Sequence, residues 1–120
     1  MNPPAAAIAV PLTVYPARIE RVIDGDTVVA RLDLGLGVTL LQPLQLAGVD
    51  APERSTEAGQ QTLAYVQERL LHQAVLVAVQ PQRARDSFGR LLATIGLDGG
   101  NFNQELIDQG HAVAYGSGKK

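Results

Sequence analysis

The sequence predicts an α+β domain that is mainly β, in which five short strands close into a small barrel flanked by two or three helices. Three observations support this fold class. Val, Ile and Thr are concentrated in short runs, turns containing glycine separate these runs, and one stretch with helical periodicity interrupts them. A length of 120 residues fits one hydrophobic core, and 46% hydrophobic with 18% charged residues favours a folded globule.

The first half of the chain reads as three strands. Two of them are expected over residues 13–23 and 27–33, joined by a tight acidic turn that contains a glycine. A second glycine turn over residues 35–37 leads into a long apolar run over residues 38–49. Because Pro43 interrupts that run and lacks an N–H group, we expect a bent or bulged strand.

The middle of the chain changes to helical spacing. Leu63, Val66 and Leu70 recur on one face of a predicted helix. Ser55 or Thr56 can cap its N-terminus, where an acidic residue in the first turn also suits the helix dipole. This stretch is therefore the first helix.

The second half returns to strands and ends with a shorter helix. Strands are expected over residues 74–79 and 91–97, with a polar turn before the second of them. Asn101 can cap the following helix, Gln104 can complete a pair resembling a capping box, and Gly110 suits the left-handed position after the helix.

This order of elements favours a closed barrel of the oligonucleotide-binding type. An open α+β sheet is the alternative. We expect the domain to span residues 15–116, with an N-terminal extension over 1–14 and a tail over 117–120. The extension lacks a basic segment and contains Pro11, so it is a poor secretory signal and too short to span a bilayer. We therefore expect a cytoplasmic protein.

Composition limits the chemistry. The chain has no cysteine, which excludes disulfides, thiolate zinc sites and a cysteine nucleophile, and leaves metals that accept oxygen or imidazole ligands. A net charge of −2 counts against a partner rich in phosphates. A local basic patch is the alternative, because three arginines lie within eight residues: Arg83, Arg85 and Arg90.

Four carboxylates next to turns are the notable polar set: Asp24, Asp26, Asp50 and Glu53. Carboxylates at strand ends can converge on a hard cation that needs several oxygen ligands. We expect Asp26 and Asp50 to be ligands. The alternative is that the acidic glycine turn is only a turn.

Two further residues have types suited to phosphodiester hydrolysis. Pro52 stiffens the turn that holds Glu53, which could act as a general base on water; the alternative is that Glu53 only caps the first helix. Arg90 stands at the start of a strand and could bind phosphate oxygens, or it could simply pair with Asp86. His72 and His111 are isolated, so capping, core or surface roles are expected.

Together these motifs resemble the staphylococcal nuclease (thermonuclease) family. The similarity extends from about Ala17 to Tyr115, and four blocks carry it, in the family's order: residues 22–27, 46–53, 86–93 and 101–112. The resemblance implies a five-stranded oligonucleotide-binding barrel that hydrolyses DNA and RNA with calcium and leaves 3′-phosphate ends.

The resemblance also implies roles for single residues. Two aspartates match the calcium carboxylates, an alanine matches a position that binds calcium through its main-chain carbonyl, and an aspartate of the first turn lies near the metal. A glutamate matches the general base and an arginine the second phosphate-binding arginine. In that order the residues are Asp26 and Asp50, Ala51, Asp24, Glu53, and Arg90.

Gln45 departs from the family pattern, which places an arginine at this position to grip the scissile phosphate. A neutral amide loses a charge-assisted contact, which should cost about 2–4 kcal/mol, or roughly thirty- to a thousand-fold in rate. Phe88 replaces a common tyrosine and loses its hydroxyl. Four arginines are candidate substitutes for the missing one: Arg31, Arg54, Arg83 and Arg85.

Three hypotheses follow. The first is a calcium-dependent endonuclease acting on DNA or RNA, single strands being favoured, with activity reduced by Gln45. The second is a catalytically inactive barrel that binds nucleic acid or protein, and the third is a structural protein that reuses the fold. No membrane partner is expected, and a monomer is the default.

Overall fold

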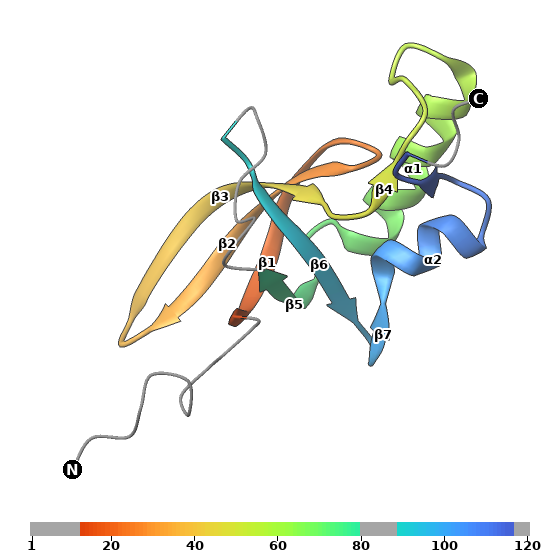
Figure 1. Ribbon diagram of the computed structural model, residues 1–120. Helices are drawn as coiled ribbons and strands as arrows, with labels where there is room; N and C mark the ends of the chain where they lie inside the picture. Colours follow the sequence, from red (N-terminus) through yellow and green to blue (C-terminus); the bar gives the residue numbers. More distant parts are fainter. Residues whose placement is uncertain (1–12, 80–88, 117–120) are drawn as a thin grey trace.

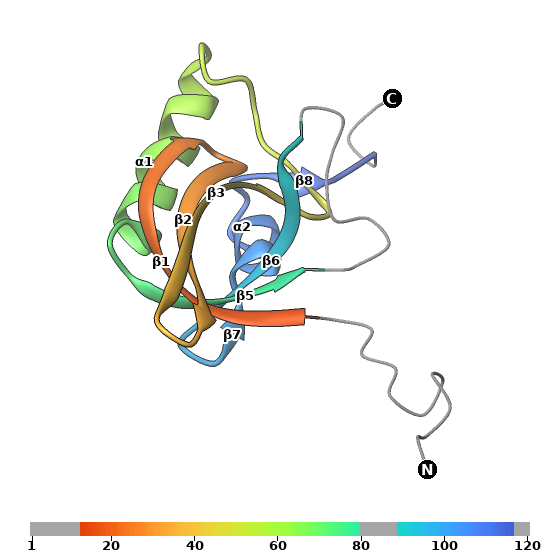
Figure 2. The same ribbon diagram turned by 90° about the vertical axis from the view of Figure 1, so that its left-hand side faces the viewer.

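Five strands curl into a closed, mixed β-barrel, and two helices pack beside it (Figures 1 and 2). The computed structural model describes residues 13–79 and 89–116. The elements in chain order are β1 (Thr13–Asp24), β2 (Thr27–Gly35), β3 (Val38–Leu46), β4 (Val49–Asp50), α1 (Glu57–Leu70), β5 (Ala74–Val79), β6 (Leu91–Leu97), β7 (Gly100–Asn101), α2 (Phe102–Asp108) and β8 (Val113–Ala114).

The barrel closes through a short parallel pairing between β3 and β6. The strand order is β3-β2-β1-β5-β6-β7, in which neighbouring strands run antiparallel. Closure joins the two ends of this order, because Leu44, Gln45 and Leu46 of β3 lie beside Leu91, Leu92 and Ala93 of β6. This pairing confirms the predicted barrel and excludes the open sheet.

Alternating side chains build the core. In β2, Val28, Ala30 and Leu32 point into the barrel and are almost fully buried, while Arg31 and Asp33 are exposed. From Ala30 onward this alternation matches a strand with one face on the core, whereas Thr27 and Val29 at the start of β2 are buried as well. In α1 the predicted apolar face is also confirmed, because its buried side chains include Leu63, Val66 and Leu70.

Both helix N-termini are capped by side chains. Thr56, rather than Ser55, caps α1 by accepting a hydrogen bond from the Gly59 N–H group. Asn101 caps α2 by accepting one from the Gln104 N–H group at 3.0 Å. The expected reciprocal contact from Gln104 is wrong, because its side chain donates to Asp108 instead. No helix among the described residues is long and apolar enough to cross a bilayer.

Of the bent or bulged strand expected around Pro43, the bulge is wrong. Register between β2 and β3 is regular from Thr39 to Gln45, and β3 ends at Leu46. The N–H group of Leu46 donates to the Asp26 carbonyl, so even-numbered residues of β3 direct their backbone groups toward β2. Pro43 has the other parity, and its missing N–H group therefore costs no bond to β2.

A buried asparagine ties the second helix to the barrel. Asn103 accepts a hydrogen bond from the Ile95 N–H group at 3.0 Å, and its amide nitrogen lies 2.9 Å from the Ala47 carbonyl and 3.1 Å from the Ala93 carbonyl. Its side chain thus binds β6 and the turn after β3 together. A buried amide with this many partners fixes the position of α2.

An ionic contact joins the two helices. Glu105 of α2 accepts two hydrogen bonds from the Arg69 guanidinium of α1, at 2.6 and 2.8 Å, and one from the Tyr65 hydroxyl at 2.5 Å. The Arg69 guanidinium, followed by the Tyr65 hydroxyl, lowers the pKa of Glu105, although partial burial opposes this. A bidentate pair of an arginine and a carboxylate has a fixed geometry.

Glu105→Gln should lower the free energy of unfolding at pH 7 by about 1–3 kcal/mol. The pKa of Glu105 is lower in the folded protein, so its contribution is fully present above the ordinary carboxyl pKa and disappears as the pH falls through the lowered value. Urea denaturation of both proteins between pH 7 and pH 3 measures this. Glu68→Gln, at an exposed position of α1, is the control and should change little. An equal effect at pH 3 would contradict the assignment.

Candidate active site

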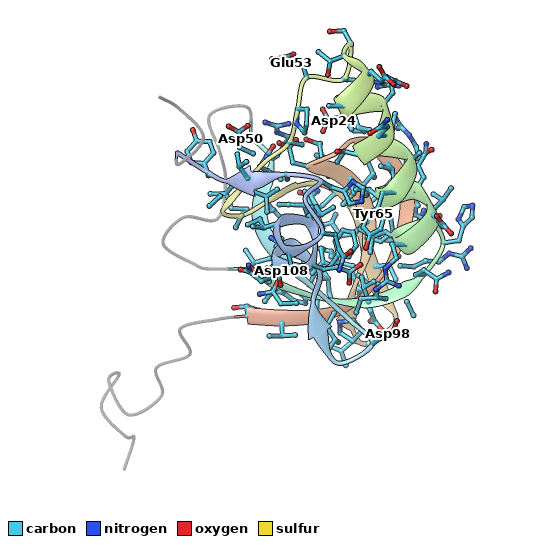
Figure 3. The ribbon with its side chains drawn as sticks, turned by 90° about the vertical axis from the view of Figure 1, so that its right-hand side faces the viewer. Asp24, Asp50, Glu53, Tyr65, Asp98 and Asp108 are labelled. Carbon is cyan, nitrogen blue, oxygen red and sulfur yellow. The ribbon has the colours of Figure 1, made fainter. Side chains whose placement is uncertain are left out.

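Three of the four candidate carboxylates can be followed in Figure 3, where Asp24, Asp50 and Glu53 lie at the same end of the molecule. Asp24 ends β1, Asp50 ends β4, and Glu53 belongs to the loop that precedes α1. Asp98 lies at the opposite end. Chain segments that are separate in the sequence therefore bring acidic side chains to one end of the barrel.

The acidic turn is locked to the loop that follows β4. Asp26 donates its N–H group to Asp24 Oδ1 at 3.1 Å, and Asp26 Oδ2 accepts the Ala51 N–H group at the same distance. Gly25 is buried between these segments, and a Cβ atom there would lie 2.6 Å from Thr62 Cγ2 and 2.8 Å from Ala51 Cβ. Only glycine fits this turn without a shift of its neighbours.

Burial and a like charge act on Asp26. Burial, together with the hydrogen bond and negative charge of Asp24, raises the pKa of Asp26 to about 6, while the Ala51 N–H group and the Thr27 hydroxyl oppose the rise. The charged form of this carboxylate is therefore poorly solvated. A cation beside it would offset both effects.

A buried hydroxyl links the turn to the residues of the barrel wall. Thr27 is 2% exposed, and its Oγ1 accepts a hydrogen bond from Arg90 Nη1 at 3.0 Å. The same oxygen lies 3.3 Å from Gln45 Oε1 and 3.4 Å from Asp26 Oδ1, which are long contacts that share one hydroxyl proton. Thr27 therefore connects Asp26, Gln45 and Arg90.

Thr27 was not predicted as a site residue, although the sequence contains the information that places it opposite Gln45. A hairpin centred on Leu36 places Thr27 opposite Gln45, as the register of β2 and β3 has it. Counting across the predicted turn would have found the pair. Because the Gln45 oxygen faces Thr27, the N–H groups of this amide are what Gln45 can offer to a ligand.

The loop that carries Glu53 is held by the start of α1. The Glu53 side chain is exposed, and its carbonyl accepts hydrogen bonds from Thr56, at 3.0 Å from N–H and 2.7 Å from the hydroxyl. The side-chain cap of α1 is Thr56 and not Glu53. A Cβ atom at Gly59 would lie 1.8 Å from the Glu53 carbonyl oxygen. Helix and loop therefore pack as one unit.

Two of the four arginines considered as substitutes can be placed. Arg54 donates from Nη1 to the Ile23 carbonyl at 2.7 Å, which sets it next to the acidic turn. Arg31 lies 3.4 Å from Glu20 in an exposed pair on the barrel wall. The others lie outside the described residues, as do two more residues singled out from the sequence: Arg83, Arg85, Asp86 and Phe88.

The ligand assignments remain predictions. Within residues 13–79 and 89–116, no three acidic or histidine side chains form a group that could hold a metal ion. The His111 ring stacks on Tyr65 at 4.1 Å between centroids, and the backbone N–H group of His72 donates to the Ile19 carbonyl.

A family model and three known bacterial proteins are similar to this chain. A family model described as "Staphylococcal nuclease homologue" matches residues 43–120. A thermonuclease of Staphylococcus hyicus is 32% identical over 103 residues, which cover 81% of this chain and 57% of the relative. An uncharacterized endonuclease of Haemophilus influenzae is 29% identical over 98 residues, covering 82% of this chain and 51% of the relative.

A third relative is much longer. Endonuclease YhcR of Bacillus subtilis is 29% identical over 113 residues, which cover 84% of this chain and 9% of that protein. The chain thus spans about half the length of two of these relatives and less than a tenth of the third.

Gly59→Ala should destabilise the protein although alanine is the better helix former. In an exposed helix the change is expected to stabilise by about 1 kcal/mol. Here the added Cβ atom meets backbone of the Glu53 loop, so we expect a net loss of more than 1 kcal/mol. Urea denaturation measures it. Ala64→Gly, at an exposed position of α1, gives the ordinary effect of this pair of residues with opposite sign. Unchanged or higher stability of Gly59→Ala would contradict the packing.

Proposed function

Because the chain belongs to the staphylococcal nuclease homologue family, we propose that it hydrolyses phosphodiester bonds of DNA or RNA with bound calcium. Asp26 and Asp50 would hold the ion, and Glu53, Arg90 and Gln45 would act on the phosphate.

One observation supports this proposal above the others. Arg90 Nη1 lies 3.0 Å from Thr27 Oγ1, and the same hydroxyl contacts Gln45 and Asp26. Thr27 therefore links a guanidinium that could bind phosphate to a carboxylate that could bind a cation. A buried threonine holds both in place, as a preorganised site requires.

The residues present fit calcium by the chemistry of their donors. Asp24, Asp26, Asp50 and the Ala51 carbonyl offer only oxygen atoms, which hard cations prefer. The Asp26 carboxylate is packed against a second carboxylate, an arrangement that favours a cation. With no group of three acidic side chains among residues 13–79 and 89–116, waters and substrate phosphate would complete the coordination. When bound, the ion would supply positive charge that polarises the phosphate.

The chain's own residues then divide the remaining work. The exposed carboxylate of Glu53 can take a proton from an attacking water. Arg90 can donate hydrogen bonds to phosphate oxygens as negative charge develops on them. Gln45 can donate only neutral hydrogen bonds, so we expect slow turnover.

A second candidate function is favoured by one residue. With Gln45 in place of an arginine, the barrel could bind nucleic acid or a protein without cleaving. A single measurement, cleavage of nucleic acid by the purified protein, distinguishes the two candidate functions.

Fluorescent single-stranded DNA and RNA should be cleaved with calcium, and a chelator should stop the reaction. Glu53→Gln should lower the rate at least a hundredfold, because removal of a general base typically costs that much. Glu57→Gln, at an exposed site four residues away, is purified identically and should keep the rate. Equal loss in both variants would contradict a specific role for Glu53. Absence of cleavage by the unmodified protein would favour the binding module.

Calcium affinity tests the ligands independently of cleavage. Asp26→Asn or Asp50→Asn should weaken calcium binding at least tenfold in titration calorimetry, because each removes a carboxylate charge. Asp98→Asn is the control, since that residue lies at the opposite end of the molecule. Unchanged affinity in the first two variants would remove the metal assignment.

Gln45→Arg should raise the cleavage rate by roughly thirty- to a thousand-fold, because it restores a charge-assisted contact worth about 2–4 kcal/mol. Thr39→Arg adds the same charge to the exposed far part of the same strand and should change the rate little. If the rate does not rise, another arginine already serves, and Arg54 beside the acidic turn is then the first residue to replace.

A further inference from the structure

The outer half of the β2–β3 hairpin exposes a strip of apolar side chains. Of the nine large hydrophobic residues that are exposed in the described part of the chain, five belong to it. The hairpin extends away from the barrel and from both helices (Figure 1). A patch concentrated in this way marks an interaction surface more often than scattered leucines do. The five are Leu34, Leu36, Val38, Leu40 and Leu41, with Leu36 fully exposed.

The same hairpin also directs backbone N–H and C=O groups of β3 away from β2. Among the described strands, the part of β3 before Leu44 pairs with β2 alone, since β6 joins only from Leu44 onward. Even-numbered residues of β3 face β2, so Thr39 and Leu41 direct their N–H and C=O groups to the opposite edge of β3, where no described strand pairs with them. The Gln42 side chain donates to the Leu41 carbonyl, which keeps a second lone pair.

Within residues 13–79 and 89–116, this edge carries none of the charged residues that usually protect an edge strand from pairing. The sequence contains no charged residue from Leu34 to Val49. The second half of β1 also pairs with only one described strand, but it carries Glu20, Arg21 and Asp24. Charges of that kind normally prevent association between edges, and their absence along β3 permits it.

The tip of the hairpin is strained to present a leucine. Leu36 adopts a positive φ of 57° between Gly35 and Gly37, which also have positive φ. Asparagine or glycine would fit this turn at lower energy, because a leucine in the left-handed region costs about 1–2 kcal/mol. An apolar side chain held there at full exposure indicates use of the surface.

We propose that β3 pairs antiparallel with β3 of a second copy of this chain. With Leu40 opposite Leu40, Thr39 of one protomer faces Leu41 of the other, and both residues direct backbone groups to the edge. The twofold axis repeats this hydrogen-bonded pair on the other side of Leu40. Pro43, which has no N–H group, ends the ladder. Because the twofold axis pairs the same edge of both protomers, the assembly closes as a dimer.

Charge favours a second copy over a lipid surface. Two uncharged strands meet without like-charge repulsion, so the strip is complementary to itself. An anionic bilayer would call for a cluster of basic residues beside the hairpin, whereas β2 and β3 together carry one, Arg31, which contacts Glu20 at 3.4 Å.

Sedimentation velocity across a concentration series tests the dimer in the full chain. The unmodified protein should shift to twice the mass of one chain as its concentration rises. Leu41→Lys should weaken dimerisation at least tenfold, because it places two like charges at the edge. Leu76→Lys, at a similarly exposed leucine of β5, is the control and should leave dimerisation unchanged. Circular dichroism checks that both variants fold.

Cysteine cross-linking tests the register. The chain has no cysteine, so Leu40→Cys introduces the only thiol. Cα atoms of a non-hydrogen-bonded pair lie about 4.5 Å apart, within the span of a disulfide, and oxidation should give a covalent dimer. Leu76→Cys should not cross-link. A monomer at every concentration, equal effects of the two lysine variants, or flotation of a monomer with phosphatidylglycerol vesicles would overturn the proposal.

Discussion

The structure depends on the parallel pairing of three residues of β3 with three residues of β6. This contact closes the barrel and sets Gln45 beside the start of β6, just after Arg90. Asn103 reinforces it from inside by binding β6 and the turn that follows β3. Without this closure Arg90 would have no fixed relation to Thr27, and the acidic turn and the guanidinium would belong to separate parts of the surface.

Local patterns in the sequence were enough to find most elements. The two hairpin turns, the apolar face of α1 and the caps at Thr56 and Asn101 all follow from neighbours a few residues apart. The pairing of Leu44 with Leu91 joins residues far apart in the chain, so no periodicity reports it. Pro43 misled the prediction, because its effect depends on which side of the strand faces β2.

The charged residues of the candidate site could be predicted from the sequence, but the hydrogen bonds and packing contacts that hold them could not. Acidic residues beside Gly25 and Pro52 stand out by type, and the structure brings several of them to one end of the barrel. Thr27 carries no charge and reads as a strand residue, yet it joins three of the candidates. Gly59 likewise reads as a weak helix residue until its contact with the Glu53 carbonyl is seen.

The two proposals assign different roles to the two ends of β2. Thr27 lies at the candidate site and Gly35 at the hairpin tip, and at the rise of a β-strand they are separated by roughly 25 Å. A dimer formed through the hairpins would leave the candidate sites of both protomers uncovered and would link them to each other. A polymer held at one site would then meet the other at high effective concentration, which strengthens attachment to long chains far more than to short ones. The length of the substrate would become a property that the protein distinguishes.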